Sequence, residues 1–324
     1  MALSALARGA FSVHGLAAGS VLSTLIFHRV HPAADPLFPG EPDAERFTRL
    51  MEFVASTFRV MTLGDALRAL EGGTLPTRAL VITFDDGYAD NAEIAMPIMR
   101  KVGVPGTFFV STGFLDGGRM WNDTVIECIR LCALTELHLE IPGCGRISLR
   151  TAEEKKKAID LILPKLKYLG LEEREAAIGL LQRAAQVERL PDHLMMTSAQ
   201  VRSLHESGME IGAHTVRHPI LASVPVEVAE QEIRDGRARL QEIVGQAVDV
   251  FAYPNGKPGR DYRAEHVEIV RRLGFRGAVT TAPGVAAAGD DVFQIPRYTP
   301  WASSLGAWSA RLFDNLRVRD FARV

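Results

Sequence analysis

ALVITFDDGYADN, residues 79–91, joins a strand-like run directly to a turn that carries two carboxylates. The first six residues are apolar, β-branched or aromatic and predict a buried strand. Asp85, Asp86 and Gly87 follow and predict a tight turn. The two carboxylates leave such a turn in different directions, so one can bind a cation while the other stays free as a base. Taken alone, however, an Asp-Asp-Gly turn is usually only a solvated turn.

Similar strand-like runs recur along the chain, with helical patterns between most of them. The strand-like runs are 21–27, 58–62, 79–84, 106–110, 209–212, 248–253, 276–281 and 292–296, and the helical patterns are 44–56, 90–102, 226–244 and 263–273. An alternation of strand and helix predicts parallel pairing, in either a doubly wound sheet or a barrel.

Residues 119–205 break this alternation with a long, charge-rich and mostly helical stretch. A segment of this length is an insertion or cap rather than a loop. Its two clearest helical patterns are 153–169 and 172–187. We therefore expect a single domain over 1–324, with this insertion inside it and amphipathic helices at 1–20 and 303–324. Cys128 and Cys132 lie one helical turn apart in the insertion, where they pack in a core or bind a metal.

Composition bounds the class of protein. A chain of 324 residues has room for one large barrel or two modest domains. Lys and Arg number 37 and Asp and Glu 39, so the net charge of −2 provides no basic field for a nucleic acid. With 47% hydrophobic and 23% charged residues the chain is an ordinary globular protein. No apolar run reaches the ~18 residues of a membrane span, and residues 1–27 lack the basic start of a signal peptide.

Polar residues follow several of the predicted strands, at the point where each strand ends. These residues are His28, Asp85 with Asp86, His214 with His218, the segment 253–256, and Arg297. The carboxyl ends of parallel strands meet on one face, where barrels and open α/β folds gather their active sites. The sequence therefore predicts a single site on this face.

HTVRH, residues 214–218, offers two imidazoles that can converge on one ion. One aspartate with two histidines leaves an open position on a tetrahedral metal, which is typical of a catalytic rather than a structural site. By itself the His-x-x-x-His pattern is weak evidence, because two unrelated polar histidines near a strand end produce it as well.

In this order and with these neighbours, the motifs resemble those of the polysaccharide deacetylase family, also called the NodB-homology or carbohydrate esterase family four domain. TFDDGY resembles the first family motif, HTVRHP the second and FAYPNG a variant of the third, and the resemblance covers about 22–118 and 206–300. It implies a distorted (β/α) barrel that uses a divalent metal, often zinc, to remove acetyl groups from N-acetylated sugars. It also implies that Asp85 is the general base and that Asp86, His214 and His218 bind the metal.

The third motif suggests how the reaction's oxyanion is stabilised. Tyr253, Pro254 and Asn255 are the expected oxyanion and substrate-binding residues. The backbone N–H of Asn255 is the expected donor, and Pro254 would fix the turn.

Two departures from the family pattern need replacements. Ala252 stands where the family commonly has an arginine that orients the catalytic aspartate. Arg297 is the expected substitute, because its guanidinium can hold Asp85 ionised; a surface arginine with an acidic neighbour is the alternative. The family's late histidine, its general acid, is also missing from FQIPRYTP, residues 293–300.

His28 is the expected general acid. LIFHRVH, residues 25–31, resembles the strand-end motif of the poly-N-acetylglucosamine deacetylase branch, in which a histidine near the amino terminus serves as the acid. A core or capping histidine is the alternative. On the substrate side we expect Trp121 to stack on a sugar and Asp123 to accept its hydroxyl groups, although a tryptophan that anchors the cap fits equally well.

The expected function is metal-dependent N-deacetylation of a sugar in a bacterial polysaccharide or its precursor, with Zn²⁺ preferred and Co²⁺, Ni²⁺ or Mn²⁺ as alternatives. A carbohydrate-binding protein without turnover and a metal amidohydrolase for a small amide remain open. We expect a cytoplasmic protein and no nucleic-acid partner; the oligomeric state stays open. The basic amphipathic pattern near residue 311 leaves association with the inner membrane surface as a further option.

Overall fold

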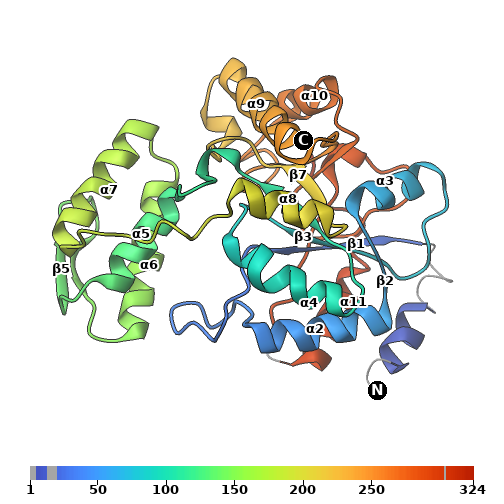
Figure 1. The fold of residues 1–324 in the computed structure, drawn as a ribbon, viewed down its shortest axis with the longest axis horizontal. Coiled ribbons are helices and arrows are strands. Elements are labelled where there is room, and N and C mark those ends of the chain that lie inside the picture. The colour runs from blue at the N-terminus through green and yellow to red at the C-terminus, as the bar shows by residue number, and fades with distance from the viewer. Residues whose placement is uncertain (1–4, 13–19, 303) are drawn as a thin grey trace.

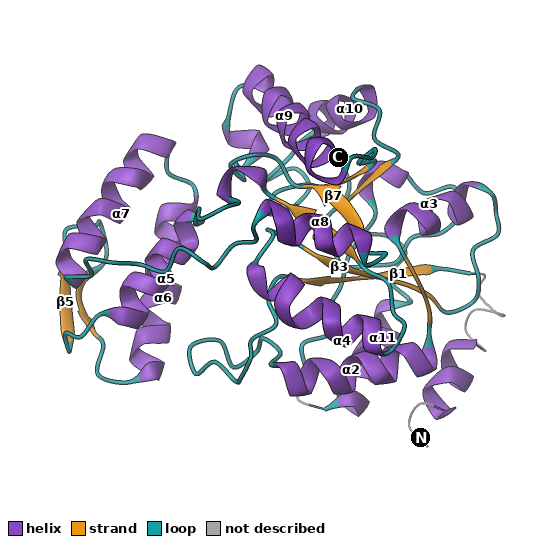
Figure 2. Cartoon of the chain, in the orientation of Figure 1, coloured by secondary structure: helices purple, strands orange, loops and turns teal. Residues whose placement is uncertain are grey.

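A parallel β-sheet with helices around it forms the main body of the protein (Figures 1 and 2). The computed structural model describes residues 5–12, 20–302 and 304–324. The strands of the sheet are β1 (Leu22–Phe27), β2 (Arg59–Met61), β3 (Ala79–Phe84), β4 (Thr107–Val110), β7 (Glu210–Ala213), β8 (Val250–Ala252) and β9 (Gly277–Val279). Their order is β1-β3-β4-β7-β8-β9, and β2 also pairs with the first half of β3.

The segment 295–298 connects the two ends of this sheet. Ile295 exchanges backbone hydrogen bonds with residues 278 and 280 beside β9, and Tyr298 N donates to Thr24 O of β1 at 2.8 Å. The sheet is thereby closed into the distorted barrel that the sequence predicts. The strand expected over 292–296 is wrong, because Val292–Gln294 form a 3₁₀ turn, η4, and only Ile295 bridges to β9. The side chain of Asp291 stabilises this turn by accepting a hydrogen bond from Phe293 N.

Helices cover the barrel on its outside. They are α2 (Ala44–Thr57), α3 (Leu63–Glu71), α4 (Met96–Lys101) after a π-helical turn η1 (Asn91–Ala95), α8 (Ser198–Glu206), α9 (Val226–Val244), α10 (Ala264–Arg272) and α11 (Leu305–Asn315), with short 3₁₀ turns η2 (Thr112–Phe114) and η3 (Leu221–Ser223). The helical patterns of the sequence match four of these positions, and α3 and α8 are additional. Between the sheet and the covering helices, Phe84 stacks on Phe108 with a centroid distance of 4.8 Å.

The insertion forms a lobe beside the barrel (Figure 1). It contains α5 (Trp121–Leu131), an antiparallel hairpin of β5 (Glu136–Leu139) and β6 (Gly145–Ser148), α6 (Ala152–Lys167) and α7 (Leu171–Ala185). We call these elements the cap. The cap has its own hydrophobic core, in which Cys128 and Cys132 are buried. Helix α8, also within 119–205, instead packs on α9 and β7 of the barrel.

The helices near the two ends pack on the body. Residues 5–12 are helical, and the Phe11 ring meets those of Phe58 and Phe313 edge to face; residues 1–4, 13–19 and 303 lie outside the described residues. In α11, Trp308 and Leu312 are buried, so the apolar face that suggested membrane contact is covered. Among the described residues no helix is long and apolar enough to cross a membrane. Membrane-surface association stays a prediction.

We expect Ile162→Ala to loosen the cap selectively. Ile162 is fully buried in the cap core, and truncating a buried isoleucine destabilises by about 2–5 kcal/mol. Hydrogen exchange should accelerate in α5, α6 and α7 and stay unchanged in β3 and β4. Leu161→Ala is the control, because Leu161 of the same helix is 38% exposed and its truncation should cost less than about 0.5 kcal/mol. Equal acceleration in the barrel strands would contradict an independent cap core.

Candidate functional site

The turn after β3 places Asp85 and Asp86 at the carboxyl end of the sheet. Asp85 N donates to Phe27 O of β1, and Ser111 N after β4 donates to Asp86 O. Asp86 has a left-handed backbone with φ 76°, which is uncommon for a residue with a side chain. Gly87 has φ 94°, and a Cβ there would lie 2.9 Å from Val110. The glycine in the motif is therefore required by close packing on β4.

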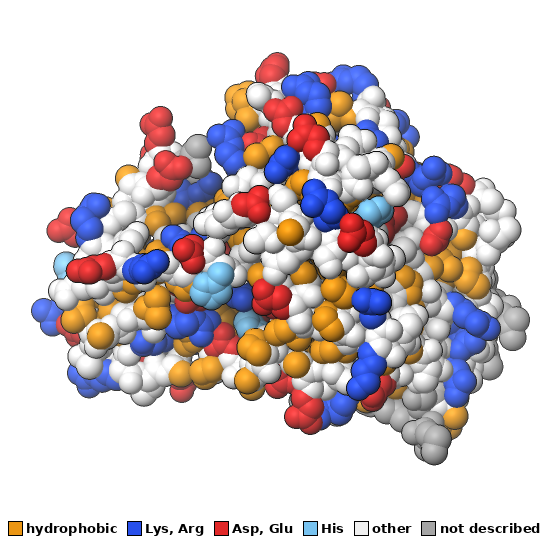
Figure 3. Space-filling view, viewed as in Figure 1, with side chains coloured by type: hydrophobic (Ala, Val, Ile, Leu, Met, Phe, Trp, Pro, Cys, Tyr) orange, Lys and Arg blue, Asp and Glu red, His pale blue; other side chains and the backbone are white. Residues whose placement is uncertain are grey.

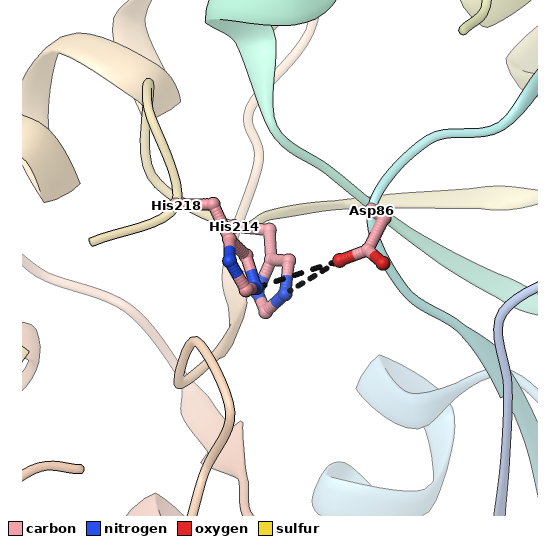
Figure 4. Close-up of side chains that lie close together, drawn as sticks. All are labelled: Asp86, His214 and His218. Carbon is pink, nitrogen blue, oxygen red and sulfur yellow. Dashed lines mark ion pairs between the residues drawn. The ribbon is translucent and has the colours of Figure 1, made fainter. Parts of the chain in front are cut away.

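Asp86, His214 and His218 bring one oxygen and two nitrogens together (Figure 4). Asp86 Oδ1 lies 3.5 Å from His214 Nε2 and 3.4 Å from His218 Nε2. Ligands about 2.0–2.1 Å from a tetrahedral Zn²⁺ lie roughly 3.3 Å from one another, so the spacing fits a small divalent metal. His214 Nδ1 donates to Ala252 O at 2.8 Å, so in the neutral imidazole the lone pair is on Nε2, the nitrogen that faces Asp86.

The protonation states also suit a metal. Burial lowers the pKa of His218 to about 4, so this imidazole is neutral at pH 7. For Asp86, burial opposes the charge, but hydrogen bonding with His214 and the charges of the surrounding imidazoles together outweigh it and lower the pKa well below the usual range. Burial opposes a charge on His214, but the carboxylates of Asp86 and Asp85 together outweigh it and raise the pKa of His214. A carboxylate and neutral imidazoles are the forms that bind a cation, so a metal would compete with a proton at His214. The donor set therefore fits a divalent metal.

Helix α9 holds the histidine loop 214–218 in place. Glu232 is buried, and its carboxylate accepts hydrogen bonds from Val216 N at 3.0 Å, Arg217 N at 2.7 Å and Arg217 Nε at 2.7 Å. One turn later, a Cβ on Gly236 would lie 2.7 Å from the Thr215 carbonyl, so glycine lets the helix approach the loop backbone. Thr215 and His218 both have left-handed backbones, with φ 65° and 53°.

Arg297 forms a buried bidentate ion pair with Asp85. Arg297 Nη1 lies 2.6 Å from Asp85 Oδ1, and Nη2 lies 2.7 Å from Oδ2. The guanidinium also donates to Thr83 Oγ1 and Thr280 O. Arg297 is 1% exposed and Asp85 is 3% exposed. Burial favours the neutral acid, but the charge and hydrogen bonds of Arg297, together with the nearby His214 and His28, outweigh it and lower the pKa of Asp85 below its usual range.

His28 lies at the exposed end of β1 and lines the same cavity as the two aspartates. Asn91 Nδ2 donates to His28 O at 2.9 Å, and Asp90 accepts from Val30 N and Arg29 Nε. Asp90 and Asn91 belong to the TFDDGYADN motif, so the motif also positions the segment that carries His28. The imidazole is at the surface of the cavity and not in the core.

The cavity has a volume of about 640 Å³ and lies between the barrel and the cap. Asp85, Asp86, His214 and His218 line its barrel side, and Trp121 and Asp123 of α5 line its cap side. Asp123 accepts a hydrogen bond from Tyr88 Oη at 3.1 Å. Burial raises the pKa of Asp123 to about 7. On the face in Figure 3, basic side chains and histidines lie where the cap meets the barrel.

Some expected site residues lie elsewhere. Tyr253 and Pro254 do not line the cavity. Tyr253 is buried, stacks on Tyr262 at 4.0 Å and donates its hydroxyl to Phe293 O, so its side chain cannot contact a substrate there. Asn255 does line the cavity, with φ 60°. The sequence did not predict the roles of Glu232, Tyr88 and Arg29. A local signal existed only for Arg29, because its partner Asp90 lies in the TFDDGYADN motif.

The chain matches the family model described as polysaccharide deacetylase over residues 72–130 and 167–278. It belongs to the polysaccharide deacetylase family. The two matched segments contain the Asp85-Asp86 turn and the histidine loop, and they leave out 131–166, which holds the hairpin and most of α6 of the cap. The family that the motifs resembled is therefore confirmed.

Individual relatives agree with this membership. YxkH of Bacillus subtilis (strain 168), whose name places it among the polysaccharide deacetylases, is 24% identical over 220 residues; the match spans 68% of this chain and half of that relative. The Streptococcus pyogenes deacetylase PplD in complex with acetate has a TM-score of 0.60 at 18% identity, covering 92% of this chain and 98% of that one. IcaB from Ammonifex degensii has a TM-score of 0.57 at 20% identity, covering 91% and 98%. These structures share the fold.

We expect Glu232→Ala to weaken metal binding while the protein stays folded. The variant removes three hydrogen bonds to the loop that carries both histidines, and loss of such outer partners typically lowers metal affinity about 10–100-fold. A competitive metal titration measures the change. Glu227→Ala in the exposed first turn of α9 is the matched control. Unchanged affinity in Glu232→Ala would show that the loop holds its shape without this carboxylate.

Proposed function

We propose that the protein removes the acetyl group from an N-acetylated sugar of a bacterial polysaccharide or its precursor, in a hydrolysis that depends on a divalent metal, with Zn²⁺ preferred. One observation carries the proposal: Asp86, His214 and His218 face the same cavity as Asp85, whose carboxylate is held by Arg297. Membership of the polysaccharide deacetylase family supports it.

Asp86, His214 and His218 are the proposed metal ligands. When bound, the metal supplies Lewis acidity toward the acyl oxygen and toward water. Asp85 is the proposed general base, which takes a proton from the attacking water. Its lowered pKa keeps it ionised at neutral pH. Both oxygens already accept from Arg297, but each keeps a further lone pair for the water proton.

His28 and Asn255 are proposed for the other two tasks of the reaction. His28 lines the cavity and is exposed to it, so its imidazole can give a proton to the leaving amine. Asn255 turns with a left-handed backbone at the cavity wall. Its N–H is the proposed donor to the negative charge that develops on the acyl oxygen.

The two rival functions gain less support. Ala252 favoured a protein without turnover, since it leaves no motif arginine for Asp85. Arg297 supplies the same bidentate contact from another segment. A small amide would use little of a 640 Å³ cavity that also presents Trp121 and Tyr168, whereas aromatic faces suit sugar rings. N-deacetylation of a sugar is therefore the preferred proposal.

Asp86→Ala and His214→Ala should each lose bound metal and acetate release together. Both side chains contribute a donor atom to the cluster, and two remaining donors hold a metal poorly. Acetate release from N-acetylated oligosaccharides and lipid-linked sugars should be measured beside the metal content. Full metal in either variant would remove that residue from the ligand set. Release from small amides but from no sugar would favour the amidohydrolase.

Asp85→Asn should keep the metal and lose turnover by several orders of magnitude. An amide is similar in shape to the carboxylate but cannot accept the water proton. Metal content and kcat on the same preparation distinguish this outcome from a loss of metal. Near-normal kcat would refute the assignment of Asp85 as base.

His28→Ala should flatten the basic limb of the pH–rate profile. A general acid must be protonated, so the rate of the native enzyme falls as pH rises through the pKa of that acid. Without His28 the rate should be lower and no longer fall over that range. His31→Ala is the comparison, because His31 contacts Glu41 in the same cavity. A basic limb that persists in His28→Ala would return the acid role to another group.

A further inference from the structure

Most charged side chains of the 640 Å³ cavity already have partners. The paired residues are Glu41 with His31, Asp85 with Arg297, Asp86 with His214 and His218, Asp123 with Tyr88, and Arg29 with Asp90. Four cationic residues of the cavity remain: Lys167, Arg174, Lys257 and Arg260. Within the described residues, none of their side-chain nitrogens has an ion pair or hydrogen bond. The cavity therefore has an unbalanced positive end.

Aromatic rings contact the two arginines of this group without accepting hydrogen bonds from them. The guanidinium carbon of Arg174 lies 5.0 Å from the centre of the Trp121 ring, and that of Arg260 lies 4.5 Å from the Tyr168 ring. A ring takes the flat face of a guanidinium and leaves its N–H edge free. The edges of both arginines can therefore donate to a ligand in the cavity.

Two acidic residues near these cations, Asp261 beside Lys167 and Glu175 beside Arg174, offset only part of the four positive charges. Burial, together with the nearby charges of Lys257 and Arg260, lowers the pKa of Lys167. Asp261 is the acidic group that opposes this effect. Its buried carboxylate already accepts from Lys257 N at 3.1 Å and Tyr168 Oη at 3.4 Å. An anion bound between these side chains would remove their mutual repulsion.

We propose that this positive end of the cavity binds a phosphoryl group of the substrate, so that the N-acetylated sugar is a phosphorylated one. Four cations suit a group that carries close to two negative charges and three acceptor oxygens. The inference rests on the proposed function and narrows its substrate class. The proposed phosphoryl site requires the cap, because Lys167 lies at the end of α6 and Arg174 in the first turns of α7.

A second, smaller cavity leaves room for what is attached to the phosphate. It has a volume of about 170 Å³ and shares Lys167, Tyr168, Arg174 and Ile220 with the first cavity. Its further lining includes the apolar Val224 and Val228 and the ion pair of Arg217 with Glu232. The phosphoryl group can thus belong to a free sugar phosphate or to a lipid-linked one. The binding chemistry at the four cations is the same in both.

The test compares N-acetylglucosamine 1-phosphate with N-acetylglucosamine by calorimetry. Both titrations use the metal-loaded Asp85→Asn variant of the whole chain, because it should not hydrolyse the sugar during the measurement. We expect the phosphorylated sugar to bind at least about tenfold more tightly. Adding Arg174→Gln and Arg260→Gln should remove that preference, measured as the ratio of the two affinities in the same variant. The control is Arg183→Gln. Arg183 lies in α7 like Arg174, but it is exposed and outside the cavity, so this variant should keep the preference.

Equal affinity for the two sugars, or an equal loss in Arg183→Gln, would overturn the phosphoryl subsite. Acetate release from native enzyme is measured separately, so a failure of the proposed function remains distinguishable from a failure of the subsite. The same sugar phosphate on a polyisoprenyl chain in detergent micelles identifies the source. If the polyisoprenyl chain increases the affinity and Val224→Ser abolishes that increase, the substrate is lipid-linked. If the polyisoprenyl chain does not increase the affinity, the substrate is a free sugar phosphate.

Discussion

The buried ion pair between Arg297 and Asp85 is the contact on which both the barrel and the site depend. Arg297 lies in the segment that links β9 to β1, and Asp85 ends β3, so the pair ties the closing segment to the middle of the sheet. Both charges are removed from water. Losing one partner of a buried pair typically costs about 3–5 kcal/mol, because the other charge is left unpaired. Closure of the fold and orientation of the carboxylate thus use the same contact.

Local patterns predicted the elements well and their partners poorly. Residues 79–84 and 226–244 are a strand and a helix with the predicted bounds, since apolar spacing alone determines them. The strand predicted over 292–296 is wrong, because a 3₁₀ turn tolerates the same apolar residues as a strand. Nothing in α9 distinguishes Glu232 from other glutamates. Its importance depends on how α9 packs against the histidine loop, which is a tertiary property.

The sequence predicted the residues expected or found at the candidate site with unequal success. Asp86 and the two histidines come from motifs whose residue types already indicate a metal, and the sequence could predict them. Tyr253 follows from the same motif logic, yet its side chain packs on Tyr262 in the core between the sheet and the outer helices; motif position does not determine the direction of a side chain. The cations of the cap were almost invisible in the sequence, because charged residues are common on any helical surface.

The left-handed residues at the site have a consequence for binding. Asp86, Thr215, His218 and Asn255 all adopt this conformation, which the chain alone would rarely populate. Hydrogen bonds donated by Ser111 and Thr281 and accepted by Glu232 hold the turns around them. The ordering entropy of these loops is therefore lost when the protein folds and not when a ligand arrives. The site is preorganised, and a ligand has to reorganise little of the backbone to occupy it.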